Sequence, residues 1–194
     1  MPRYVALLRA INVGGHVVKM DRLRAVFSAL GFSGVETFIA SGNVIFSSPE
    51  PDAAALERRV ETALAEALGY EVATFIRTPE ELAAIVAHRP FAVEPAAGAG
   101  TIYVILLARP LSPAARKQIA ALGTPSDELA CKGREVYWCR HGNLLESTVS
   151  GLEMGKALGG PVTMRNRNTI VRLVARLANE SGTAAPKKTR KEKA

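Results

Sequence analysis

Three short polar segments carry the residue types that could bind a charged ligand. The first follows an apolar run and extends from Arg9 to Gly15, with an arginine, an asparagine and two glycines. Such residues can expose successive backbone N–H groups, which cradle an anion. The second segment is Ser41-Gly42-Asn43, and the third, Thr163 to Thr169, supplies fixed positive charge. The candidate ligand-binding residues are Arg9, Asn12, Gly14, Gly15, Ser41, Asn43, Arg165, Asn166 and Asn168.

These residue types predict a small anionic ligand of the phosphate or nucleotide class. The guanidinium groups of Arg9 and Arg165 would contact the anion, and the amides of Asn12 and Asn43 would orient it. Arg9 adds weight to this interpretation, because a cation at the end of a strand buried on both faces needs a partner or a ligand.

An ordinary structural explanation also fits each segment taken alone. Gly14 and Gly15 can simply adopt positive φ, and Ser-Gly-Asn is a common hairpin turn. Asn166 or Asn168 can cap a helix. Because turn chemistry is much commoner than ligand chemistry, the pocket is predicted from the three segments together and from none of them alone.

Signatures of catalysis and metal binding are sparse. The sequence lacks the G-x-S-x-G, H-E-x-x-H, G-x-x-x-x-G-K-[ST] and G-x-G-x-x-G patterns. The three histidines, His16, His88 and His141, are scattered along the chain. No metal and no cofactor are therefore expected, and catalytic residues stay unknown. No pair of side chains stands out as acid and base, so enzymatic activity stays an open question.

The two cysteines, Cys131 and Cys139, flank a predicted hairpin turn at 132–134. A disulfide needs Cα atoms within about 7 Å. With a two-residue turn Cys131 pairs with Val136 and Cys139 lies on the opposite face; with a three-residue turn the cysteines are about 13 Å apart, at ~3.3 Å per residue. Free thiols and a cytoplasmic location follow. The apolar runs, such as 102–108, are too short to cross a membrane.

The charge is unevenly distributed. The whole chain has a net charge of +7, and its last nine residues include five Lys or Arg and one Glu. Residues 181–194 are predicted to be a disordered basic tail. Two alternative functions follow from different features: nucleic-acid binding through the basic body and tail, and a protein-interaction module. The oligomeric state is not predicted.

The element order is β-α-β-β-α-β followed by a second β-α-β-β run and two helices. The repeat is architectural, with no residue-level repeat. We predict an α+β protein of two packed ferredoxin-like units, residues 1–78 and 79–180, the second carrying the C-terminal helices. The predicted strands are 4–9, 35–40, 44–47, 71–76, 101–107 and the two arms of the 131–139 hairpin; the predicted helices cover 23–30, 52–68, 80–88, 113–122, 151–158 and 170–177.

Two predicted strands are apolar at nearly every position, Tyr4–Leu8 and Ile102–Leu107. This pattern indicates burial on both faces. In a ferredoxin-like sheet the helices cover only one face, so we expect the other half of the chain to cover the second face.

The three polar segments resemble the motifs of the DUF1697 family of bacterial proteins. The stretches "LLRAINVGGHVVKM", "FIASGNV" and "TMRNRNT" correspond to family elements L-L-R-G-I-N-V-G-G, Y-I-x-S-G-N-V and T-R-N-W-N-T. The resemblance extends to about Ala178 and implies two α-β plait units. It implies no established activity.

Two residues depart from the family pattern. Ala10 stands where the family usually has glycine, which is compatible with a similar turn. Arg167 stands where the family has tryptophan, which removes an aromatic ring from the expected site. If relatives stack that ring on a ligand, this chain replaces it with a guanidinium or has lost the function.

Overall fold

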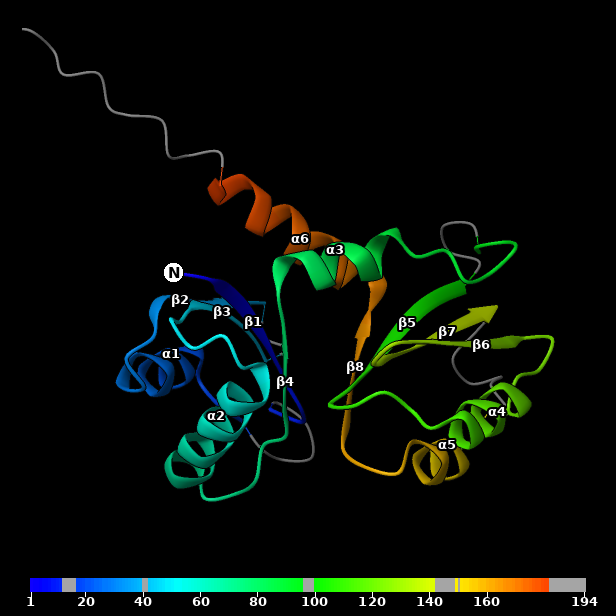
Figure 1. The fold of residues 1–194 in the computed structure, drawn as a ribbon, viewed down its shortest axis with the longest axis horizontal. Coiled ribbons are helices and arrows are strands. Elements are labelled where there is room, and N and C mark those ends of the chain that lie inside the picture. The colour runs from blue at the N-terminus through cyan, green and yellow to red at the C-terminus, as the bar shows by residue number, and fades with distance from the viewer. Residues whose placement is uncertain (12–16, 40–41, 96–99, 142–148, 150, 182–194) are drawn as a thin grey trace, which may run out of the picture.

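The computed structural model describes residues 1–11, 17–39, 42–95, 100–141, 149 and 151–181. Within them, two four-stranded antiparallel sheets and six helices form an α+β fold (Figure 1). No helix in these ranges is long and apolar enough to cross a membrane.

The first sheet has the strand order β2-β3-β1-β4, with β1 in its interior. Helix α2 begins after Asp52, whose side chain accepts from the N–H of Ala54. Helix α3 begins after Thr78, which forms a capping box with Glu81 and precedes a proline. The elements are β1 (Arg3–Leu8), α1 (Met20–Ala29), β2 (Ser33–Phe38), β3 (Asn43–Ser47), α2 (Ala53–Leu68), β4 (Thr74–Arg77) and α3 (Pro79–Ala87).

The second sheet repeats this topology with the strand order β6-β7-β5-β8. Counted from the first strand of each unit, both sheets have the order 2-3-1-4, and each unit ends in an extra helix, α3 or α6. The elements are β5 (Gly100–Leu107), α4 (Pro113–Ala121), β6 (Asp127–Lys132), β7 (Glu135–His141), α5 (Gly151–Leu158), β8 (Val162–Asn166) and α6 (Arg167–Ser181).

Strand β8 differs from the sequence prediction, which treated Thr163–Thr169 as a polar segment around a helix start. It pairs with β5, and its side chains alternate between buried Thr163 and Arg165 and exposed Met164. The sequence pattern did not predict this strand, because polar residues occupy the buried positions where a strand usually has apolar ones. Here they are buried because acceptors on the opposite sheet satisfy them.

The two units also match residue by residue. Tyr4-Val5-Ala6-Leu7-Leu8 of β1 corresponds to Tyr103-Val104-Ile105-Leu106-Leu107 of β5. Arg77 lies opposite Val5 and Arg165 lies opposite Val104, so the two arginines occupy equivalent positions. The expectation of no residue-level repeat is therefore wrong. The strands that carry the repeat are short, and the first two are separated by about ninety residues that include three helices and three strands.

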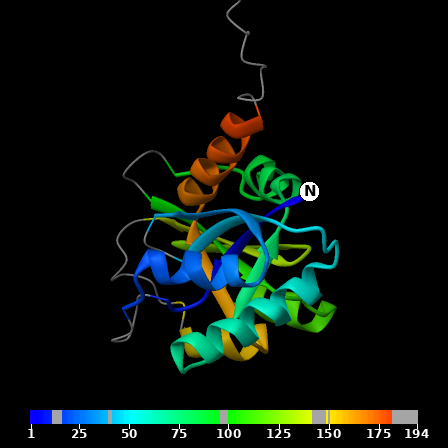
Figure 2. The same cartoon turned by 90° about the vertical axis from the view of Figure 1, so that its left-hand side faces the viewer.

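Each sheet has one face against its own helices and one against the other unit (Figures 1 and 2). Helices α1 and α2 cover the first sheet, and α4 and α5 cover the second. The inner faces share one apolar core with α3 and α6, which pack against each other. The expectation that the second face is covered by the other half is confirmed. This shared core includes Val5, Leu7, Ile45, Phe75, Val104, Leu106, Tyr137, Leu82, Ile85, Ile170 and Leu173.

Two acidic residues of α2 protect the edge of β4. Glu57 accepts a hydrogen bond from the N–H of Ile76 at 2.8 Å, and Glu61 accepts from Thr74 at 2.8 Å. These acceptors satisfy backbone donors that an edge strand leaves unpaired. Burial raises the pKa of Glu57, because it penalises the charged carboxylate.

The cysteine hairpin has a two-residue turn, one of the two turn lengths considered from the sequence. Cys131 lies opposite Val136, and the thiols of Cys131 and Cys139 are free. The prediction of no disulfide is confirmed.

Candidate functional site

Arg165 of β8 contacts the described part of the Ser41-Gly42-Asn43 segment and Leu8, the residue immediately before the Arg9–Gly15 segment. Its guanidinium is buried between the sheets, and all five of its N–H groups have an acceptor. Nε donates to Asn43 Oδ1 at 2.7 Å, and Nη2 donates to the carbonyls of Leu8 and Gly42 at 2.9 and 3.3 Å. Nη1 donates to Thr163 Oγ1 at 2.7 Å and to the carbonyl of Met164 at 2.9 Å. Arg165 therefore holds the ends of β1 and β3 against β8.

The turn before β3 packs closely on the end of β1. Gly42 has φ +69°, and a Cβ at this position would lie 3.2 Å from side-chain atoms of Leu8 and Ile11. The carbonyl of Gly42 accepts from the N–H of Leu8 at 2.8 Å. Asn43 is fully buried, and its Nδ2 donates to the carbonyl of Phe38 at 3.1 Å. Glycine at 42 is thus required by both space and backbone conformation.

Arg77 makes the same contacts at the opposite end of the interface. Its Nη2 donates to the carbonyls of Leu107 and Arg134 at 2.9 and 3.4 Å, and its Nη1 donates to its own neighbour Ile76 at 3.0 Å. Its Nε donates to Glu135 Oε1 at 3.0 Å. Leu107 corresponds to Leu8 in the other unit. The chain therefore contains two arginine clamps, each reaching from the last strand of one unit to the other unit.

The clamps differ in the residue that accepts from Nε. Asn43 lies opposite Leu7, and Glu135 lies opposite Leu106, so the two acceptors are equivalent. Arg77 donates to the carboxylate of Glu135, whereas Arg165 donates only to neutral acceptors. Burial lowers the pKa of Arg165 to about 10, and no acidic residue in the described part of the chain opposes the shift. The pKa of Arg77 is also lowered by burial, but Glu135 opposes that shift.

The connections around the two clamps also differ in length. Beside Arg165, β1 and α1 are joined by residues 9–19 and β2 and β3 by residues 39–42. The equivalent connections beside Arg77 are 108–112 and 133–134. Among the described residues, the non-glycine positions with positive φ are Ala10 at +54° and Ile39 at +50°, both in the longer connections. A β-branched residue in this region is strained, and such strain concentrates at functional sites.

Arg9 is exposed, in contrast to the expectation that it ends a buried strand. Strand β1 ends at Leu8, so Arg9 needs no protein partner. Its side chain makes no hydrogen bond or ion pair with the described part of the chain. It lines a cleft of about 600 Å³ with Glu61, Glu71 and Pro161. This guanidinium is therefore available to a ligand, and Arg9 directly follows Leu8, whose carbonyl accepts from Arg165.

The remaining predicted site residues are spread more widely. Asn166 is the residue before α6, and its Oδ1 accepts from the N–H of Asn168, which is exposed. Arg167, at the family's tryptophan position, donates to Glu94 and to the carbonyl of Val86, both at 2.8 Å. It therefore anchors the segment after α3 and does not join the Arg165 clamp. Asn12, Gly14, Gly15 and Ser41 lie outside the described residues.

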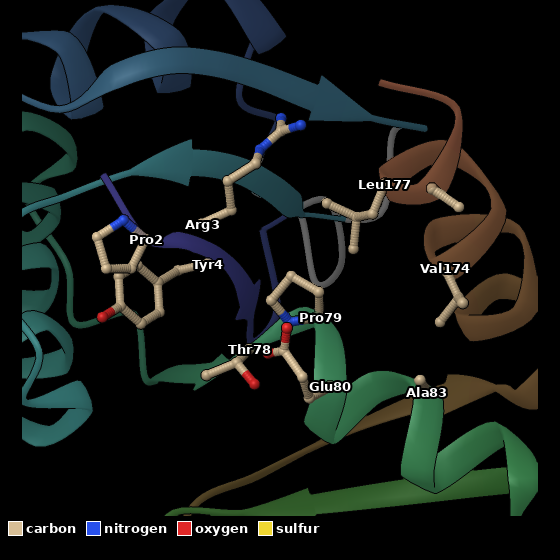
Figure 3. A pocket seen from close by; sticks show the side chains of 10 residues that line it. Pro2, Arg3, Tyr4, Thr78, Pro79, Glu80, Ala83, Val174 and Leu177 are labelled. Carbon is tan, nitrogen blue, oxygen red and sulfur yellow. The ribbon is translucent and has the colours of Figure 1, made fainter. Parts of the chain in front are cut away.

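A second concave surface lies at the far side of the interface (Figure 3). It is a groove of about 530 Å³ between the starts of β1 and α3 and the later part of α6. Val174 and Leu177 give it apolar walls, and Glu80 is its carboxylate, whose pKa is lowered by its own backbone N–H and the Thr78 hydroxyl. Arg3 also lines this groove, so its apolar walls carry one charge of each sign and do not single out an anion.

Neither cysteine fits the role of a nucleophile. Burial raises the pKa of the Cys131 thiol, and burial together with nearby carboxylates raises the pKa of Cys139 to about 11. Both thiols are therefore protonated at neutral pH, and the thiolate is the reactive form.

Comparison with known proteins places the chain in a family. The family model described as a protein of unknown function, DUF1697, matches residues 1–137. The chain belongs to the DUF1697 family. No curated protein matches it. It is similar to the solved structure of a conserved bacterial protein, SP0830, from Streptococcus pneumoniae, with 25% identity and a TM-score of 0.68. The likeness covers 91% of this chain and 98% of that one.

Family membership helps to explain Ala10, one of the two residues that depart from the family pattern. Ala10, where DUF1697 proteins usually have glycine, has φ +54°. This is the left-handed region that glycine adopts without strain, so the family residue is explained by backbone conformation.

Sequence reasoning missed the Arg77 clamp. Both clamps share one local pattern, a short strand ending in an arginine, followed by a cap residue and a helix, as in "FIRTPEEL" and "TMRNRNTI". Aligning these two stretches would have identified Arg77 as the counterpart of Arg165.

Proposed function

We propose that this DUF1697 protein binds a small anionic ligand, of the phosphate or nucleotide class, beside the Arg165 clamp. The observation that carries the proposal is the buried charge of Arg165, which lacks the carboxylate that its counterpart Arg77 has in Glu135. A buried charge without a counter-ion is costly. An anion bound nearby would compensate it.

We assign the direct hydrogen bonds to the ligand to donors other than the Arg165 guanidinium. All five N–H groups of Arg165 are occupied by protein acceptors. Its contribution is electrostatic: at about 7 Å and an effective dielectric constant of ~20, one unit charge attracts an anion by about 2 kcal/mol. Arg9 is the direct contact in this proposal, together with the backbone donors that the sequence predicts at Asn12, Gly14 and Gly15.

The acidic residues in the Arg9 cleft limit what can bind there. Glu61 and Glu71 line the same cleft, and Glu61 Oε1 is engaged by the N–H of Thr74. A highly charged polyanion would be repelled by these carboxylates. A compact ligand with one phosphate or carboxylate group fits better, with its anionic end toward Arg9.

Both units are also proposed to be ferredoxin-like plaits. The support is the βαββαβ order with all pairs antiparallel and the central position of the first strand beside the third and fourth. In this arrangement the open face of each plait is used for contact between the units. The ligand would therefore bind at the ends of the strands.

The test is a thermal-shift and calorimetric titration with inorganic phosphate, pyrophosphate, AMP, a sugar phosphate and a short single-stranded oligonucleotide. A ligand at about 100 times its dissociation constant stabilises a protein by about 2.7 kcal/mol. We expect one of the small anions to stabilise the protein, and Arg9→Ala to weaken its binding at least tenfold.

Arg109→Ala is the matched control, because Arg109 is exposed in the equivalent connection of the second unit. Equal losses in both variants, or no binding by any small anion, would overturn the proposal. The basic residues near the C-terminus lie outside the described residues, so nucleic-acid binding stays a prediction. Steeply salt-dependent binding of the oligonucleotide alone would favour that alternative.

A further inference from the structure

Three potential metal ligands gather on the inner face of the β6–β7 hairpin. Glu128 lies directly opposite Cys139 in the strand register, and His141 is two residues further along β7 on the same face. One ligand atom from each lies within 4.8 Å of the other two. We propose that Glu128, Cys139 and His141 form a binding site for a zinc ion, separate from the proposed anion site.

The distances are close to those that zinc requires. Zn–S and Zn–N bonds of about 2.3 and 2.05 Å at a tetrahedral angle place the two ligand atoms about 3.6 Å apart. Cys139 Sγ and His141 Nε2 are 3.6 Å apart. His141 Nε2 and Glu128 Oε1 are 2.8 Å apart, and a shared zinc ion would require about 3.3 Å. For this pair the difference is about half an ångström, and the ligand atoms of Cys139 and Glu128 lie within 4.8 Å of each other.

The chemical types of the ligands favour zinc over harder ions. A thiol, an imidazole and a carboxylate together suit a borderline-soft divalent ion, whereas calcium and magnesium prefer oxygen ligands only. Zinc would displace the proton of the thiol and the proton that His141 Nε2 and Glu128 share.

The surroundings favour a cation that enters from one side. The carboxylates of Glu94 and Asp127 add negative charge near Cys139, and each is also ion-paired with an arginine. Cys139 is buried, whereas the side chains of His141 and Glu128 are 34% and 44% exposed. The ion would thus bind with the thiolate beneath it and with solvent above. A water molecule would take the fourth tetrahedral position, as in zinc sites that act on substrates.

The site was not predicted because its ligands have no motif spacing. Glu128 and Cys139 are eleven positions apart, and the register of the hairpin brings them together. The strands also make the site rigid, since both β6 and β7 are held in the second sheet.

The experiment is a titration of the reduced full-length protein with Co²⁺, which reports a thiolate ligand by a charge-transfer band in the near ultraviolet. Zinc content after equilibrium dialysis is the second readout. We expect one Co²⁺ per chain with this band, displaced by Zn²⁺, and about one zinc retained per chain.

Cys139→Ser should abolish the band and lower zinc affinity at least tenfold. Cys131→Ser is the matched control, because Cys131 is the other free thiol of the same hairpin, and it should keep both signals. His141→Gln, with circular dichroism to confirm folding, tests the site if Cys139→Ser does not fold. No charge-transfer band in the natural protein, or a band that survives Cys139→Ser, would overturn the proposal.

Discussion

The two arginine clamps use the same backbone contacts but have different electrostatics. Arg77 is paired with Glu135 and is surrounded by short connections, whereas Arg165 is paired with the neutral Asn43 and is surrounded by long ones. A duplicated unit would have begun with equal ends. The end with a carboxylate serves packing, and the end with a buried charge that has only neutral acceptors, with strained residues and longer connections, is the one suited to a ligand.

The largest difference between the clamps should appear when each arginine is removed. Arg77→Met leaves the carboxylate of Glu135, only 13% exposed, without its partner. We expect a loss of about 3–5 kcal/mol in the free energy of unfolding.

Arg165→Met leaves only neutral acceptors unpaired, so its expected loss is about 2 kcal/mol. Chemical denaturation of the two variants measures both values. An equal loss, or a greater loss for Arg165→Met, would contradict the electrostatic distinction between the clamps.

The turns that precede β3 and β7 extend the comparison of the two clamps. Gly42 and Gly133 both have positive φ, but only Gly42 has side chains within 3.2 Å of the place of a Cβ. We expect Gly42→Ala to cost about 2–4 kcal/mol, from backbone strain and crowding against Leu8 and Ile11. Gly133→Ala should cost about 1–2 kcal/mol, mainly from backbone strain, because its one close neighbour, Glu135 Oε2 at 3.3 Å, is the end of a flexible side chain. Thermal or urea unfolding of both variants checks the order, and the reverse order would disprove the close packing of the longer turn.

The smallest expected change in stability is at Glu57, whose carboxylate is near the positive charge of Arg77. Its pKa is raised by burial and lowered in part by Arg134 and Arg77. Because the folded-state pKa lies above the unfolded value, ionisation of Glu57 lowers stability as the pH rises from about 4.

Glu57→Gln retains an acceptor for the N–H of Ile76 and removes the charge. We expect it to be up to about 1 kcal/mol more stable than the natural protein at pH 7 and nearly equal to it at pH 4. Urea unfolding at the two pH values measures the difference. A variant that is less stable at pH 7 would show that the charge of Glu57 is needed.

Much of the fold was predictable from local patterns. The apolar period of α2, the Thr78-Pro79 start of α3 and the turn at Gly133-Arg134 are encoded by neighbouring residues. Strand β8 was missed because Thr163 and Arg165 are polar residues whose acceptors lie more than a hundred positions away. The candidate site was predicted only in part for the same reason. The residue types of the polar segments identified Asn43 and Arg165 as candidates. Their contact with each other, and the role of Arg77, depend on how the two sheets face each other.

The most direct test of the account is to give the Arg165 clamp the charge that the Arg77 clamp already has. Asn43→Asp places a carboxylate beside Arg165 without a change in side-chain size. The measurement is a calorimetric titration of the natural protein and of Asn43→Asp with the small anion that binds most tightly in the panel above. Glu135→Gln serves as the control at the other clamp, and circular dichroism verifies folding. We expect Asn43→Asp to weaken binding at least tenfold and Glu135→Gln to leave it unchanged. Equal affinity in the natural protein and Asn43→Asp would contradict the claim that the uncompensated charge of Arg165 creates the anion site.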